Sequence, residues 1–304
     1  MNDISSTNAS LPARVIRILK DEGAKGVGWR LKRKASKHLT ALLRLIFPPR
    51  CKLCGGRTSR RKAYGKTFHK CQTCEFIFTL DYNPMIVRKG MGMTGSWSGS
   101  DGGGYREEFL VKMLMTDLGM KSFLLYGTGN TPTFVKLSEE GVDVIGCDIS
   151  QDVVKYKKAK FGNDSFFMPQ DLPVERKYDA IVAVEVLEHL TEPKETISLL
   201  LSKLNVNGLI CGTTNFYLGG SIDDDSKLYT RGYMSFNLHV AYWSQKSISR
   251  IASDYGYAVS AFEMISPLTG LPNKCIFFIH RACEHGAYFD NLLKTTPILP
   301  IDRP

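Results

Sequence analysis

The alternation of short apolar runs with helical patterns over residues 105–304 is the feature that most constrains the fold of this chain. Apolar runs with the length of buried strands lie at 122–126, 142–147, 164–168, 178–184, 208–214, 257–265 and 274–281. Amphipathic stretches lie between most of them, at 105–118, 132–140, 151–161, 194–204 and 244–255. Strands that alternate with helices predict an α/β fold with a doubly wound, mostly parallel seven-stranded sheet of the Rossmann-like type.

Two cysteine pairs precede this region. Cys51 and Cys54 are separated by two residues, as are Cys71 and Cys74, and sixteen residues lie between the pairs. Each pair closes a tight turn that directs two thiolates to one point, and two such turns complete a tetrahedron around Zn²⁺. Four protein ligands leave no position for a substrate, so we expect a structural zinc ion. Redox-active C-x-x-C is the alternative, which two matched pairs ahead of any βαβ unit disfavour.

Basic residues are concentrated near the N-terminus. Residues 1–70 contain 18 Lys and Arg against three acidic residues, whereas the remainder contains 22 against 27. Residues 11–47 resemble basic amphipathic helices, which either lie on an anionic membrane or pack on their own protein. A polyanionic partner is expected. Peripheral contact of residues 11–50 with anionic membrane is favoured over nucleic acid.

These features divide the chain into four predicted segments. They are a basic helical extension (1–49), a zinc ribbon (50–80), a glycine-rich linker or lid (81–104) and an α/β domain (105–304). Seven of the residues 90–104 are glycine, which suits a lid that closes over a ligand or a plain tether. The sequence shows no secretory signal and no apolar stretch of spanning length. We therefore expect a cytoplasmic protein, with peripheral contact to the inner face of the membrane as a further expectation.

A ligand site is predicted where the first two strands of the α/β domain end. Gly127-Thr128-Gly129 lies between a strand and a helix, so the backbone can approach a nucleoside-type ligand closely. The second strand ends at Asp148, about twenty residues later, where a carboxylate accepts hydrogen bonds from ribose hydroxyls. On these residues alone, a dinucleotide site remains open.

The continuation of the sequence resembles the class I S-adenosylmethionine (SAM)-dependent methyltransferases over residues 105–282. The resemblance rests on Met168-Pro-Gln-Asp171-Leu172 and on Glu185-Val-Leu-Glu188-His189-Leu190. It implies SAM as cofactor, and it implies contacts to SAM from Tyr126, Gly127, Thr128, Gly129, Asp148, Ile149, Asp171, Leu172, Glu185 and Val186. The chain departs from the family at Tyr126, where an acid is usual, and at Thr131, where a third glycine is usual. A SAM-like fold that no longer binds SAM is the alternative.

Together with the cysteine pairs, the chain is similar to bacterial sugar and natural-product methyltransferases with an N-terminal zinc ribbon. The sugar C-methyltransferases among them have adjacent Tyr, Glu and His residues, of which only His239 is matched here, because Phe236 and Leu238 replace the others. We therefore expect O-methylation of a small-molecule, sugar or glycan-type acceptor. The alternatives are a sugar C-methyltransferase, a zinc-ribbon nucleic-acid-binding protein or RNA methyltransferase, and a membrane-associated scaffold that binds SAM without turnover.

Two histidines are the candidate catalytic residues. A hydroxyl acceptor must lose its proton, and a neutral imidazole suits that task. His239 and His189 follow strands at the edge of the sheet where ligands bind in open α/β folds. A buried hydrogen-bonding role is the alternative for His239. Candidate substrate contacts flank the glycine-rich segment and the long 214–238 connection: Trp97, Tyr105, Arg106, Tyr217 and Arg231. Asp223–Asp225 is either a metal ligand set or, more simply, a solvated turn.

Overall fold

The computed structural model describes residues 48–89, 103–217, 231–265, 272–295 and 299–300. The chain divides into two compact units, Met1–Pro49 and Arg50–Pro304, and every element given below belongs to the second. The basic helices expected at 11–47 lie outside the described residues. Among the helices of the described ranges, none has the length and hydropathy needed to span a membrane.

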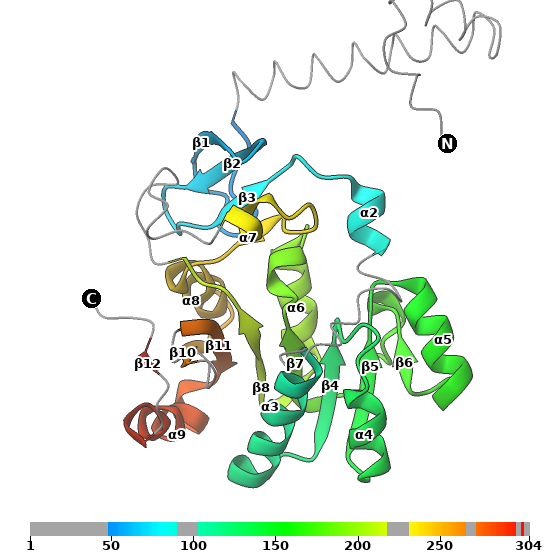
Figure 1. The fold of residues 1–304 in the computed structure, drawn as a ribbon. Helices are drawn as coiled ribbons and strands as arrows, with labels where there is room; N and C mark the ends of the chain where they lie inside the picture. The colour runs from blue at the N-terminus through cyan, green and yellow to red at the C-terminus, as the bar shows by residue number, and fades with distance from the viewer. Residues whose placement is uncertain (1–47, 90–102, 218–230, 266–271, 296–298, 301–304) are drawn as a thin grey trace, which may run out of the picture. The chain divides into compact units, whose positions relative to one another are not determined.

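The central sheet has eight strands in the order β12-β10-β11-β8-β7-β4-β5-β6 (Figure 1). Its strands are β4 (Ser122–Tyr126), β5 (Asp143–Cys147), β6 (Phe166–Phe167), β7 (Tyr178–Val184), β8 (Leu204–Thr214), β10 (Ala258–Ile265), β11 (Pro272–His280) and β12 (Leu299–Pro300). Strands β6, β5, β4, β7 and β8 are parallel, and β11, β10 and β12 are antiparallel additions. The predicted doubly wound, mostly parallel sheet of seven strands is confirmed, with the two-residue β12 added at one edge.

Period-two alternation along the strands builds a core on each face of the sheet. On β4, Leu124 packs into one core cluster and Leu125 into the other, because successive side chains of a strand point to opposite faces. The first face is covered by α6 (Pro193–Ser202) and α8 (Gln245–Ser253). The second is covered by α3 (Gly103–Leu118), α4 (Thr133–Glu139), α5 (Gln151–Phe161) and α9 (Ala282–Thr295).

The cysteine-containing segment forms a second, antiparallel sheet with the order β1-β2-β3-β9. Its strands are β1 (Thr58–Ala63), β2 (Lys66–Cys71), β3 (Ile77–Thr79) and β9 (Ala241–Tyr242). Positive φ angles at Tyr64 and Gly65 form the two-residue hairpin turn that joins β1 to β2. Because β9 belongs to the α/β region, the small sheet is completed by a strand from a distant part of the sequence.

Helix α2 (Pro84–Lys89) and helix α7 (Arg231–Ser235) lie where the sequence analysis expects irregular connections. For α2 the local signal is Asn83-Pro84, since proline suits the first helical turn and the Asn83 side-chain oxygen accepts the Met85 amide at 3.0 Å. The linker predicted for 81–104 is therefore partly helical at its start, and its last two residues belong to α3.

Candidate active site and cysteine cluster

The site forms where β4, β5 and β7 end side by side. Strand β4 lies between β5 and β7, so the chain leaves β4 toward one edge of the sheet and later returns to build the other half. At such a switch point the loops after adjacent parallel strands separate and leave a crevice for a ligand. The three strand ends carry Gly127–Gly129, Asp148 and Glu185.

The glycine turn after β4 requires glycine at two positions. Gly127 and Gly129 have φ angles of +75° and +58°, in the left-handed region that residues with side chains rarely adopt. A Cβ atom on Gly127 would also lie 2.5 Å from Val186 Cγ2. The Gly127 amide donates to the Cys147 carbonyl at 2.7 Å, which fixes the turn against β5.

A buried carboxyl group from α3 anchors the same turn. Glu107 is 2% exposed, and its Oε2 accepts hydrogen bonds from the hydroxyls of Thr131 at 2.9 Å and Thr128 at 3.2 Å. Burial raises the pKa of Glu107 to about 7. Thr131, which stands where the family usually has a third glycine, therefore holds the loop by a polar contact. Sequence reasoning missed Glu107, although its spacing from Leu110 and Leu114 places it on the buried stripe of α3.

Asp148 lies beside the turn and is 7% exposed. Its Oδ2 accepts the Gly129 amide at 2.8 Å and its Oδ1 accepts the Ser150 amide at 2.7 Å. Burial raises the pKa of the Asp148 carboxyl from its ordinary value, and these amide hydrogen bonds oppose the rise. The carboxylate is thus held rigidly at the tip of β5. A turn with glycine at Gly127 and Gly129, beside a fixed carboxylate, fits the nucleoside part of SAM.

The remaining residues predicted at the cofactor lie at the ends of β4 and β5 and just after β6. Tyr126 is the last residue of β4 and is buried, whereas Ile149, next to Asp148, is 45% exposed. Asp171 ends a short 3₁₀ helix after β6 (Pro169–Asp171), and Leu172 follows it as a buried residue.

Glu185 is held in a strained conformation at the end of β7. Its φ angle is +55°, which is uncommon for a residue with a side chain. Its carboxylate accepts the Thr213 hydroxyl at 2.8 Å and is paired with Lys274 of β11. Arg106 is predicted as a substrate contact, and its Nη1 lies 3.9 Å from Glu185 Oε1. The structure thus brings two residues predicted for different ligands into one ion-pair cluster.

The two predicted catalytic histidines lie together, with ring centroids 5.0 Å apart. His189 Nδ1 is 3.0 Å from the Leu238 carbonyl oxygen, and His239 Nδ1 is 2.8 Å from the Tyr233 carbonyl oxygen. Because a carbonyl only accepts, each Nδ1 carries the hydrogen, and each Nε2 keeps a lone pair. Burial lowers the pKa of both imidazoles, that of His239 to about 3, so both rings are neutral at physiological pH.

Glu188 adjoins the histidines and is fully buried. Its Oε2 accepts the Thr214 hydroxyl at 3.0 Å, whereas Oε1 has no hydrogen-bond partner among the described residues. Burial, together with the nearby Glu185 carboxylate, raises the pKa of Glu188 to about 8. The sequence analysis used Glu188 only as part of the family motif and gave it no role of its own.

Three of the predicted substrate residues cannot be placed at the site. Trp97 lies outside the described residues, as do the side chains of Tyr105 and Arg231. Tyr217 is 2% exposed and packs with Phe68 and Tyr242. Its hydroxyl donates to the Glu75 carbonyl oxygen, so the structure places Tyr217 against the cysteine-containing sheet.

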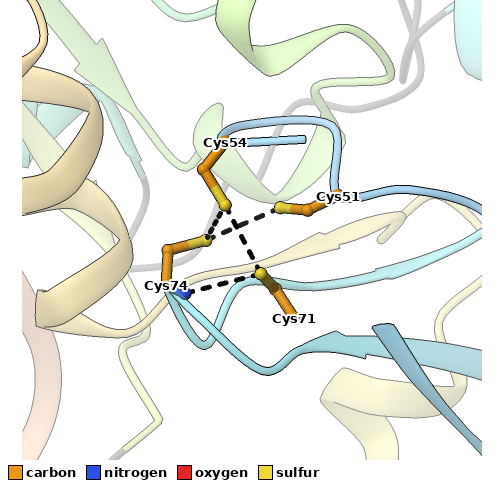
Figure 2. Close-up of side chains that lie close together, drawn as sticks. All are labelled: Cys51, Cys54, Cys71 and Cys74. Atoms are coloured by element: carbon orange, nitrogen blue, oxygen red, sulfur yellow. Dashed lines mark hydrogen bonds between the residues drawn. The ribbon is translucent and has the colours of Figure 1, made fainter. Parts of the chain in front are cut away.

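The four predicted metal-ligating cysteines converge, as Figure 2 shows. Sulfur–sulfur distances are 3.5 Å for Cys51–Cys74, Cys54–Cys71 and Cys54–Cys74. Zn²⁺ bound tetrahedrally at about 2.3 Å would place sulfurs about 3.8 Å apart. In each pair the amide four residues after the first cysteine donates to its carbonyl, at 2.9 Å for Cys51 and 3.1 Å for Cys71. The donor set and geometry are compatible with zinc.

The strand order and the placement of the strand ends are those of open α/β proteins, which bind ligands at the switch point of the sheet. The sequence of residues 107–261, just over half of the chain, matches a family described as a methyltransferase domain. The chain belongs to this family, and it is a SAM-dependent methyltransferase. No curated protein matches the chain.

Several solved methyltransferase structures are similar to this chain. Magnesium protoporphyrin IX methyltransferase of Synechocystis PCC 6803, with bound SAH, is 20% identical and covers 58% of this chain and 83% of its own, with a TM-score of 0.42. The plantazolicin methyltransferase BpumL is 13% identical; the match covers 59% of this chain and 84% of BpumL, also with a TM-score of 0.42. A possible histamine N-methyltransferase of Thermotoga maritima is 12% identical over 59% and 89%, with the same TM-score.

Proposed function

We propose that this enzyme transfers the methyl group of SAM to a hydroxyl of a small-molecule, sugar or glycan-type acceptor. The observation that carries the proposal is the pair of neutral imidazoles at His189 and His239, whose Nε2 lone pairs are not used by the backbone. A hydroxyl is a poor nucleophile until its proton is removed or its oxygen is polarised, and lone pairs of this kind supply that activation. In this proposal His239 and His189 activate the acceptor.

The crevice residues hold the cofactor in this proposal. SAM supplies an activated methyl group on a sulfonium with a neutral leaving group. The Gly127–Gly129 backbone lies against the cofactor, and Asp148 accepts hydrogen bonds from its ribose hydroxyls. The Glu185 carboxylate is fixed by Lys274 and Thr213, and in this proposal it contacts the cofactor. Their task is orientation, because an in-line displacement needs the acceptor oxygen, the methyl carbon and the sulfur aligned.

The cysteine cluster supports this arrangement from outside the crevice. We propose that Cys51, Cys54, Cys71 and Cys74 bind a structural Zn²⁺, which orders the small sheet that ends in β9. The segment that carries His239 leads directly into β9, and the Val240 carbonyl accepts the Thr79 amide at 3.0 Å. In this proposal the zinc ion positions the segment that carries His239, on the acceptor side of the site.

Calorimetric titration with SAM tests the cofactor assignment. Asp148→Ala removes a buried carboxylate at the crevice, and a hydrogen bond to a charged group contributes about 1.5–3 kcal/mol. We expect SAM affinity to fall about 10- to 100-fold. Asp152→Ala, the same change at an exposed position on α5, is the matched control and should leave the affinity unchanged. Equal affinity of the Asp148 variant and the wild type would contradict the assignment.

Product analysis tests the acceptor class. The enzyme is incubated with isotope-labelled SAM and a panel of nucleotide-linked sugars, matched amino sugars and RNA. Label on a sugar oxygen, located by NMR, is the expected result. Label on a ring carbon would replace O-methylation by sugar C-methylation, and label on RNA would favour the nucleic-acid alternative.

A further inference from the structure

A second group of metal-ligand side chains lies beside the crevice. Glu188, His189 and His239 each place one ligand atom within 4.8 Å of the others. Two of them are neighbours in the short 3₁₀ helix after β7 (Leu187–His189), and the third arrives fifty residues later, ahead of β9. Nothing in the cysteine cluster is shared with this group.

The buried carboxyl group of this set uses only one of its two oxygens in hydrogen bonds among the described residues. Glu188 is 0% exposed, and its Oε1 makes no hydrogen bond within the described part of the chain. A buried carboxyl oxygen without a hydrogen bond costs several kcal/mol. The neighbouring Glu185 is already paired with Lys274. Glu188 therefore has one oxygen available for a cation.

Both imidazoles have the hydrogen-bonding pattern of metal-ligating histidines. Each Nδ1 is fixed by a backbone carbonyl, which sets both the ring orientation and the tautomer. Histidines that bind metals commonly have this outer hydrogen bond, with the other ring nitrogen on the ion. Partly buried, neutral imidazoles suit a cation because neither ring has to lose a proton.

We propose that Glu188, His189 and His239 bind a divalent transition-metal ion of the Mn²⁺, Fe²⁺ or Zn²⁺ type. One carboxylate and two imidazoles form a ligand set typical of such ions, and three protein ligands leave positions open for water and an acceptor oxygen. Ligand atoms on one ion lie about 3–3.5 Å apart, so small side-chain rotations close the group around it.

Resting on the proposed function, the ion would bind the acceptor hydroxyl and lower its pKa. The O–H bond then breaks and the proton passes to solvent water. The oxygen forms a bond to the methyl carbon as the carbon–sulfur bond breaks, which leaves a neutral thioether. His239 and His189 would in this case activate the hydroxyl through the ion that they hold.

Mn²⁺ is the probe for the test, because it prefers oxygen and nitrogen ligands and leaves the thiolates to zinc. Metal content of the full-length protein is measured first, and Mn²⁺ binding is then titrated by electron paramagnetic resonance. We expect one Mn²⁺ per chain, or two zinc ions per chain as isolated if zinc already occupies the group. Glu188→Gln and His239→Asn should each weaken Mn²⁺ binding at least tenfold, or lower the zinc content to one.

Glu192→Gln, the same chemical change at an exposed position paired with Lys52, is the control and should bind the ion normally. Calorimetry with SAM shows that each variant is folded. Wild-type protein with one zinc and no Mn²⁺ binding up to 1 mM, or folded variants that bind as well as the wild type, would overturn the metal site. If the ion binds but no hydroxyl acceptor is methylated, the metal site stands and the proposed function fails.

Discussion

Thr131 shows how a departure from a family pattern is accommodated by one distant residue. A third glycine at this position would leave the turn free of side chains, whereas the Thr131 hydroxyl binds the buried Glu107 carboxyl at 2.9 Å. The Lys157 ammonium also donates to the Thr131 carbonyl at 2.9 Å. The turn therefore gains two anchors from α3 and α5. Only the first anchor depends on the threonine hydroxyl, because the second uses a backbone carbonyl that glycine would also offer.

Burial of the single residue Glu107 predicts that the stability of the protein depends on pH. Its pKa is about 7 in the folded protein and about 4.5 when unperturbed, so the folded state holds the proton more tightly than the unfolded chain. Stability from this group is complete below about pH 4.5 and is lost as the pH rises through about 7. Glu107→Gln cannot ionise and avoids that loss. Between pH 5 and 8 we expect the variant to gain about 1–3 kcal/mol over the wild type in free energy of unfolding.

Urea denaturation at both pH values measures this difference. Glu139→Gln, at an exposed position on α4, serves as the control, and its difference from the wild type should stay constant with pH. A constant difference for the Glu107 variant as well would show that the carboxyl is not held protonated by burial.

Single residues at strand ends were predictable from the sequence, but residues placed by packing were not. Gly127 and Asp148 could be placed because each directly follows an apolar run that forms a strand. Glu107 could not be predicted in this way, because its role depends on the packing of α3 against the glycine turn. Tyr217 was predicted at the substrate because it lies in a long connection with other tyrosines. Its position against Glu75 depends on β3 pairing with β9, a contact between distant parts of the sequence that no local pattern encodes.

Elements were predicted best where periodicity extends over a full strand or helix. The limits of β4 were predicted to the residue. Strand β8 begins at Leu204, four residues before the predicted start at 208. The prediction missed these residues because the polar Asn205 and Asn207 interrupt the apolar pattern. In the structure, a register shift opposite Tyr178 and Ala180 accommodates them. Helix α9 was missed because Gly286 weakens its helical signal. In the structure, the ring of Phe289 packs against that of Phe278 in β11, with centroids 4.4 Å apart, and this contact holds α9 against the sheet.

The pairing of β3 with β9 yields a prediction at the scale of elements. Removing zinc with a chelator should free the cysteine turns and thereby β3, because the metal supplies much of the folding energy of such small motifs. Hydrogen exchange at residues 77–79 and 240–242 should then accelerate at least tenfold, while β4 and β5 stay protected. Cys74→Ser should reproduce the effect without the chelator.

A chelator could also remove an ion held by Glu188, His189 and His239, so the Cys74 variant is the decisive arm. If exchange in β9 is unchanged when only the cysteine cluster is broken, then zinc does not position the acceptor side of the site. Thr79 and Phe78 would in that case be held by the β3–β9 pairing and by their packing, without the metal.

In the whole molecule, the basic N-terminal extension and the catalytic residues occupy different parts of the sequence. Residues 1–47 contain ten Lys and Arg against three acidic residues. The unit from Arg50 onward has a core on each face of its sheet, both cysteine turns and every described residue of the crevice. We infer that the basic segment is not needed for SAM binding and serves contact with a polyanion, for which an anionic membrane surface is our proposal.

Deletion of residues 1–47 tests this separation of roles. Each Lys or Arg near an anionic membrane contributes about 1 kcal/mol, and salt screens the attraction. The full chain should therefore sediment with vesicles that contain phosphatidylserine at low salt, but not at 0.5 M salt or with neutral vesicles. The 48–304 protein should bind SAM with unchanged affinity and remain in the supernatant. Salt-sensitive binding of the full chain to RNA, without sedimentation on vesicles, would instead identify nucleic acid as the polyanion and revive the RNA methyltransferase alternative.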